Sequence, residues 1–99
     1  VEQMPLFPGG DAALMAYLRD NIHYPTVAAE NGVQGRVVVG FVVERDGSIT
    51  DVNVLRSVDP SLDREAMRVV KGMPRWTPGK QNGITVRVNY RVPVLFRLQ

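Results

Sequence analysis

The stretch RVVVGFVVERDGSITDVNVLR, residues 36–56, decides the fold of this chain. The apolar side chains that alternate along its first half fall on one face: Val37, Val39, Phe41 and Val43. This period of two is typical of a half-buried β-strand. The dipeptide Asp46-Gly47 comes next, and it favours a tight hairpin turn because glycine accepts positive φ without steric cost. The sequence therefore predicts a strand over residues 36–45 that returns antiparallel over residues 49–56.

A helix is expected directly after this hairpin. Asp59 suits the N-cap position, and Pro60 suits the first helical position, where no amide hydrogen is needed. Gly72 and Pro74 end the helical pattern. The apolar residues at helical spacing are Leu62, Ala66, Val69, Val70 and Met73. Trp76 follows in a turn region, and we interpret it as a core anchor beside this helix.

An earlier helix is expected over residues 11–22, with Asp11 as its N-cap. Its apolar stripe consists of Leu14, Met15, Leu18 and Ile22. Tyr24-Pro25 ends this helix because proline disfavours helical geometry at the residue before it. A further short turn is expected over residues 27–30. Residues 1–10 contain two prolines and two glycines, which predicts an irregular lead-in before a single domain over residues 11–99.

The longest alternation in the chain covers residues 84–98 and predicts one long strand. Its apolar face consists of Ile84, Val86, Val88, Tyr90, Val92, Val94, Phe96 and Leu98. If this strand joins the far side of the first strand, the sheet order is 2-1-3 and the second helix is an ordinary crossover. The expected fold class is α+β, a three-stranded antiparallel sheet of mixed connections with two helices packed on one face.

Composition limits the chemistry that this chain can perform. The chain has 99 residues, of which 44% are hydrophobic, so one domain can bury an ordinary core. It has no cysteine, which excludes disulfides, a thiolate nucleophile and a cysteine-rich zinc site. No stretch approaches the roughly 18 consecutive apolar residues of a membrane span. Because the chain begins at a valine, we expect it to be a processed product or a fragment.

Charge is distributed unevenly along the chain. All ten acidic residues lie between Glu2 and Glu65, and the seven basic residues that follow have no acid among them. The total is only +2, but the last third carries +7 and the rest −5. A basic surface for an acidic partner is one interpretation, and mutual neutralisation of the two parts in the folded protein is the other.

Pro93 identifies the last strand as an edge strand, because proline inside a central strand would remove a ladder hydrogen bond. The face opposite the apolar one carries Arg87, Arg91 and Arg97. These arginines and the proline could serve only to prevent edge-to-edge aggregation. The alternative is β-augmentation, in which an extended peptide adds as a further strand and the arginines attract its acids.

Several motifs together resemble the TonB C-terminal domain family. These are Tyr24-Pro25, Gly35-Arg36-Val37, Asp46-Gly47, Asp51-Val52 and Trp76-Thr77-Pro78-Gly79. The resemblance covers residues 11–98, and the order and spacing of the motifs are more specific than any one of them. The segments Phe7-Pro8-Gly9-Gly10 and Val92-Pro93-Val94 are similar to versions common in Bacteroidetes.

The resemblance implies a periplasmic domain of an inner-membrane-anchored energy transducer. Its expected partners are the TonB box and plug of outer-membrane TonB-dependent transporters, and an ExbB/ExbD-type complex reached through a part outside this chain. The peptide-binding residues that it implies are Ile84, Thr85, Val86, Arg87, Val88, Asn89, Tyr90, Arg91 and Val92. The residues that it places near the plug are Arg19, Asp20, Asn21, His23, Tyr24 and Pro25. Two departures bear on this, since Pro93 limits the added strand and Val27 stands where some relatives have a basic residue.

Other functions are less well supported by the residues. The candidates for catalysis are His23, Asp46, Asp51, Asp59, Asp63 and Glu65, and turn, cap and helix-start positions account for most of them. One histidine makes no metal cluster, and no phosphate-binding loop occurs, so we expect no enzyme, metal or cofactor. Nucleic-acid binding is not expected either, because Tyr90 and Phe96 fall on the apolar face rather than on the arginine face.

Two alternatives keep the fold and change its use. The same domain can serve a membrane sensor or peptidase fusion, or an envelope assembly contact, because a fold does not fix a function. A strand-exchanged homodimer is also compatible with a long C-terminal edge strand and short hinge loops.

Overall fold

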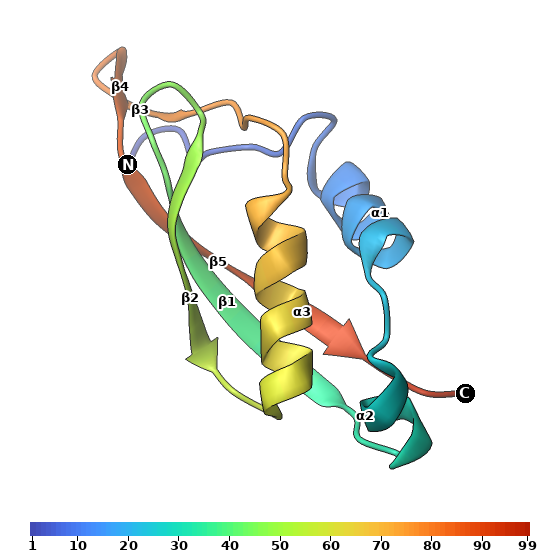
Figure 1. Cartoon of the computed structure of the whole chain (residues 1–99). Coiled ribbons are helices and arrows are strands. Elements are labelled where there is room, and N and C mark those ends of the chain that lie inside the picture. The colour runs from blue at the N-terminus through green and yellow to red at the C-terminus, as the bar shows by residue number, and fades with distance from the viewer.

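The computed structural model describes all 99 residues. The elements in chain order are α1 (Asp11–Asn21), α2 (Thr26–Glu30), β1 (Gly35–Val43), β2 (Ile49–Arg56), α3 (Pro60–Lys71), β3 (Gly79–Gln81), β4 (Ile84–Val86) and β5 (Val88–Phe96). Figure 1 shows α1 and α3 on the same side of a long, twisted sheet. None of the helices is both long enough and apolar enough to cross a membrane.

The main sheet has the order β2-β1-β5, and both outer strands run antiparallel to β1. This confirms the predicted fold class and strand order. The β1–β2 hairpin forms because Gly47 adopts a φ of 85° and the Asp46 carboxylate accepts a 2.9 Å hydrogen bond from the Ser48 amide. The sheet therefore has two edges, formed by β2 and by β5.

The core lies between the sheet and the helices. The alternation in β1 is confirmed, because the exposed fraction is at most 3% for Val37, Val39, Phe41 and Val43. Trp76 is a core residue as predicted, since it is 3% exposed and its ring lies 5.4 Å from Phe41 and 5.0 Å from Tyr90. The lead-in contributes Phe7, whose ring meets Trp76 edge-on at 5.8 Å. Aromatic contacts thus join the first residues of the chain to the sheet.

The helices begin where their sequences indicate, with one exception. In α3 the Asp59 carboxylate caps the helix by accepting a 3.0 Å hydrogen bond from the Ser61 amide, as predicted. In α1 the predicted cap is wrong, because Gly10 is the N-cap residue and Asp11 is already helical without a capping hydrogen bond. The φ of 89° at Gly10 explains the difference, since a turn of that shape favours glycine at the cap position. Met15 also departs from the apolar stripe and is 48% exposed.

The predicted single strand over residues 84–98 is wrong in its first part. The chain pairs as a separate β3–β4 hairpin over residues 79–86 and enters the main sheet only at Val88. The hairpin turn is Asn82-Gly83, whose φ values of 54° and 75° are those of a tight hairpin connection. Because β4 pairs with β3 instead of β1, Ile84 lies outside the core and is 67% exposed.

The lead-in has no helix or regular strand, but it is attached to the β3–β4 hairpin. Gln3 forms an isolated bridge with Lys80, and Leu6 forms another with Thr77. The main-chain hydrogen bonds of these two bridges measure 2.8–3.0 Å. Residues 1–8 therefore run alongside the segment that leads into β4.

Candidate functional site

The free flank of β5 is the most prominent feature of the fold outside the core. β5 pairs with β1 from Val88, opposite Val43, to Phe96, opposite Gly35, in an uninterrupted register. No strand of the chain pairs with its other side, because β5 is the last strand in the order of the main sheet. A row of main-chain amide and carbonyl groups along this flank is consequently without a β-ladder partner.

Pro93 indicates which residues point toward the free flank. It lies opposite Val38 within the unbroken β1–β5 register. Since proline has no amide hydrogen, this position fits the ladder when its nitrogen points away from β1. Amides alternate in direction along a strand, so those of Asn89, Arg91 and Leu95 point the same way. The flank before Pro93 thus offers amides and carbonyls at Asn89 and Arg91, and a carbonyl at Pro93.

The structure divides the predicted peptide-binding residues into three groups. Ile84, Thr85 and Val86 lie in β4, Arg87 lies in the break between strands, and residues 88–92 lie in β5. The side chain of Val92 belongs to the core and that of Tyr90 packs against it, Val88 is half-buried, and the side chains of Asn89 and Arg91 are exposed. The straight part of the edge is therefore shorter than the sequence indicated and begins after Arg87.

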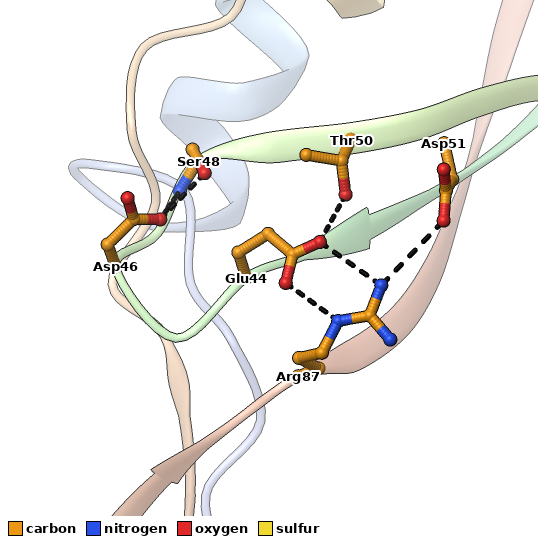
Figure 2. Close-up of polar contacts among 6 residues, drawn as sticks. All are labelled: Glu44, Asp46, Ser48, Thr50, Asp51 and Arg87. Atoms are coloured by element: carbon orange, nitrogen blue, oxygen red, sulfur yellow. Dashed lines mark hydrogen bonds and ion pairs between the residues drawn. The ribbon is translucent and has the colours of Figure 1, made fainter.

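Arg87 is held by the protein's own carboxylates, as Figure 2 shows. Its Nε lies 2.7 Å from Glu44 Oε1, and its guanidinium also lies 3.7 Å from Asp51. Thr50 donates its hydroxyl to the same Glu44 carboxylate. Hydrogen bonds from Arg87, followed by that from Thr50, hold the pKa of Glu44 below its usual value. Arg87 thus fixes the junction of β4 and β5 and is a weak candidate for attracting a partner.

Arg91 and Arg97, in contrast, are exposed and belong to none of the five ion pairs of the chain. The other C-terminal cations that do find a carboxylate are Arg68, with Glu65, and Arg75, with Asp46. Folding therefore neutralises only part of the basic C-terminal third. The sequence did not indicate which arginines stay free, because Glu44 and Asp51 come close to Arg87 only through strand pairing.

The residues predicted near the plug lie at the end of α1 and in the link to α2. They are Arg19, Asp20, Asn21, His23, Tyr24 and Pro25, and the structure keeps them in one continuous segment. The Tyr24 ring packs edge-on against Phe96 at 5.5 Å, and its hydroxyl donates to the Val33 carbonyl. This segment consequently lies beside the C-terminal end of β5, whereas the predicted peptide site includes the opposite end.

Two α3 residues support this segment, and the sequence did not identify either as part of the site. The Glu65 carboxylate accepts 2.7 Å hydrogen bonds from Arg68 and a 2.6 Å bond from the His23 amide. Arg68 also donates to the Asn21 carbonyl at 2.9 Å. The hydrogen bonds from Arg68 are the main reason that the pKa of Glu65 is lowered. Spacing along α3 predicts the Glu65–Arg68 pair, but only the tertiary structure brings it to the link.

The residues considered for catalysis are distributed over separate elements. Asp46 and Asp51 lie at the β1–β2 hairpin, Asp59 caps α3, and Asp63 accepts hydrogen bonds from Ser57 and Val58. No group of three or more histidine, cysteine, aspartate or glutamate side chains is arranged to hold a metal ion.

The fold and the site define a class: a small α+β domain whose helices cover one face of a three-stranded antiparallel sheet and whose last strand has a free flank. The model of the family Gram-negative bacterial TonB protein C-terminal matches residues 20–98. The chain belongs to this family.

Two relatives of this chain are TonB proteins, as the family match predicts. Protein TonB of Helicobacter pylori is 29% identical over 77 residues, which are 77% of this chain and 26% of that protein. Protein TonB of Xanthomonas campestris pv. campestris is 36% identical over 76 residues, which are 76% of this chain and 34% of that protein. The chain thus spans about a quarter to a third of the length of these relatives.

Solved structures show the same fold. The solution NMR structure of the Pseudomonas aeruginosa TonB C-terminal domain has a TM-score of 0.63 and 32% identity, and the match covers 79% of each chain. A solution structure of the Helicobacter pylori TonB C-terminal domain has a TM-score of 0.66 at 23% identity, covering 87% of this chain and 90% of that one. The family match begins at residue 20, so the lead-in and most of α1 lie outside it.

Proposed function

We propose that this domain binds the TonB box of outer-membrane TonB-dependent transporters by adding it as a strand to the free flank of β5. The parent protein is an inner-membrane-anchored energy transducer in this proposal, and an ExbB/ExbD-type complex supplies it with energy from the proton-motive force. The domain then works in the periplasm as a binding module without catalytic activity. The observation that supports this function best is the one-sided pairing of β5 along nine residues.

Main-chain pairing along this flank is expected to give weak binding by itself. The amides and carbonyls of Asn89 and Arg91, with the Pro93 carbonyl, make about five hydrogen bonds, worth roughly 0.5 to 1.5 kcal/mol each. Ordering the peptide opposes this by about 1 to 2 kcal/mol per residue. Side-chain packing and attraction to Arg91 must supply the rest, and we expect an affinity near micromolar, equivalent to about 8 kcal/mol. Salt should weaken it.

The segment from Arg19 to Pro25 is the second part of the proposed site. In this proposal it contacts the transporter plug while the TonB box pairs with β5. The Glu65–Arg68 pair supports the proposal because it fastens the Asn21 and His23 main chain to α3. The Tyr24–Phe96 contact then links the segment to the far end of β5.

An NMR titration with peptides from transporter N-termini tests the function. Amide shifts should concentrate at residues 87–92, and a plug fragment should shift the residues near His23. Shifts confined to other elements, or none at millimolar peptide, would refute the proposal. A second copy of the chain competes for the same flank, so light scattering over a concentration series should accompany the titration. A strand-exchanged dimer that never releases β5 would also refute peptide binding there.

A further inference from the structure

One face of the sheet is turned away from α1 and α3 (Figure 1). Strand pairing places the residues of this face in rows across β2, β1 and β5. One row consists of Arg56, Val38 and Pro93, and the next consists of Asn53, Gly40 and Arg91. Arg36 lies opposite Leu95 in the row beyond Val38. We call this surface the open face.

Three arginines of the open face have no acidic partner. Arg36, Arg56 and Arg91 are exposed, and none of them forms an ion pair or a side-chain hydrogen bond within the chain. The carboxylates of Glu44 and Asp51 lie on the same face and are both engaged by Arg87, and Asp51 also lines the hollow at the centre of the face. Arg36, Arg56 and Arg91 thus leave the open face with an excess of positive charge over these two carboxylates.

A hollow lies at the centre of the open face, and Gly40 is one of its lining residues. The hollow has a volume of about 660 Å³, and Met4, Asn53, Leu55 and Arg91 are among the residues around it. A Cβ atom on Gly40 would lie 2.8 Å from the Leu55 Cδ1 atom, so Leu55 lies directly over the glycine. Leu55 and Leu95 are 48% and 52% exposed. Exposed leucines thus lie next to the unpaired arginines, since Leu55 precedes Arg56 in the chain and Leu95 lies opposite Arg36.

We infer that the open face binds an acidic, leucine-containing segment of the same partner that adds a strand to β5. The inference rests on the proposed function, because Arg91 belongs both to the strand that offers the free flank and to the open face. Guanidinium groups match carboxylates in a planar, two-bonded geometry. Arg91 lines the hollow, Arg56 follows Leu55 in the chain, and Arg36 lies opposite Leu95. An acidic segment that continues from the added strand would place carboxylates on these arginines and a leucine side chain against the exposed Leu55.

The test uses peptides that separate the two surfaces. The first is a short peptide of aspartate, glutamate and leucine with proline at every third position, which cannot pair as a strand because proline lacks the amide hydrogen. The second is a neutral, strand-forming peptide that probes only the β5 flank. A third repeats the first with lysine in place of the acids.

In NMR titrations of the whole chain the acidic peptide should shift the amides of Val38, Gly40, Asn53 and Leu55, and the lysine peptide should not. Raising salt from about 50 to 500 mM should weaken its binding about tenfold or more. The double variant Arg36→Glu with Arg56→Glu should weaken it by a similar factor. The matched control, Arg64→Glu with Lys71→Glu on α3, should leave it unchanged.

The outcomes distinguish this inference from the proposed function. If the neutral peptide shifts Asn89 and Arg91 while the acidic peptide shifts nothing on the open face, the inference is refuted and the proposed function stands. If the acidic peptide shifts the open face, and neither the neutral peptide nor a transporter N-terminal peptide shifts Asn89 and Arg91, the open face is a binding surface and strand addition is refuted. If vesicles of anionic phosphatidylglycerol bind through Arg36 and Arg56 and the acidic peptide does not, the partner is a lipid surface and the inference is wrong.

Discussion

The Arg87 guanidinium lies 2.7 Å from the Glu44 carboxylate, across the end of the β1–β5 ladder where β4 gives way to β5. The contact fixes the junction between β4 and β5. It also neutralises one of the C-terminal arginines, so that Arg87 is less available to an acidic partner. Arg91, four residues later, has no such partner. Two arginines that look alike in the sequence therefore have different roles.

Replacing Arg91 by glutamate should change binding, whereas replacing Arg87 by glutamate should change stability. Arg91→Glu should weaken the binding of an acidic peptide about fivefold to tenfold at low salt and leave the melting temperature nearly unchanged. Arg87→Glu should lower the melting temperature, because the new carboxylate would face those of Glu44 and Asp51. Thermal unfolding and fluorescence titration of both variants measure this. Equal loss of affinity with equal stability would contradict the distinction.

Proline substitution can close the free flank without disturbing the fold. Asn89→Pro removes an amide that points away from β1, so the main sheet should form while strand addition is lost, with affinity reduced at least about tenfold. Tyr90→Pro is the matched variant, since its amide belongs to the β1 ladder and its loss should cost about 3 kcal/mol or more of stability. Denaturant unfolding and peptide titration distinguish the two. Unchanged affinity in a folded Asn89→Pro protein would place the peptide elsewhere.

Two turn glycines should respond differently to alanine. Gly47 has a φ of 85°, and a Cβ atom there would lie 2.0 Å from the Trp76 carbonyl oxygen, so Gly47→Ala should cost more than about 3 kcal/mol. Gly83 has a φ of 75° with open space around it, so Gly83→Ala should cost only about 1 to 2 kcal/mol. Urea unfolding of both variants measures the difference. Similar losses would show that backbone strain, rather than the close approach to Trp76, determines the effect.

Trp76 should tolerate phenylalanine much better than alanine. Its Nε1 atom is buried without a hydrogen-bond partner in the protein, which is unfavourable for an indole. Trp76→Phe removes that group and keeps most of the aromatic contacts, so it should cost about 1 to 2 kcal/mol. Trp76→Ala should cost about 3 to 5 kcal/mol because it opens a cavity among Phe7, Phe41 and Tyr90. A Trp76→Phe loss as large as that of alanine would imply that the Nε1 group is satisfied.

Acid should destabilise the domain through Glu65. The pKa of Glu65 is lowered in the folded protein by the Arg68 hydrogen bonds, so its contribution to stability is complete above the unfolded value, about 4.3. That contribution is lost as the pH falls through the folded pKa. Glu65→Gln should lower the free energy of unfolding at pH 7 by about 1 kcal/mol, and this value is small because Arg68 is half exposed and solvent screens the pair. It should also make the loss of stability on the acidic side of the pH profile less steep. Melting temperatures between pH 2 and 7 measure both effects, and an unchanged acidic side of the profile would contradict the role of Glu65.

Local sequence patterns were sufficient for most of the fold. Three features could be predicted because each depends only on residues close together in the chain. They are the alternation in β1, the Asp46-Gly47 turn and the helix start at Asp59-Pro60. Pro93 also identified the edge strand, because a missing amide has the same consequence in any sheet. The Asn82-Gly83 dipeptide could have predicted the second hairpin, but the longer alternation around it concealed that pattern.

The sequence by itself determined the fold class, the strand order and most of the core, since these depend on hydrophobic periodicity and turn chemistry. The family resemblance came from the order and spacing of its motifs. Only the tertiary structure decided which arginines stay free, where the last strand bends and what holds the link near His23. Those features depend on contacts such as Glu44 with Arg87 and Glu65 with His23, which are 43 and 42 residues apart. Charge pairing at such separations follows from strand register and helix placement, and no local pattern encodes it.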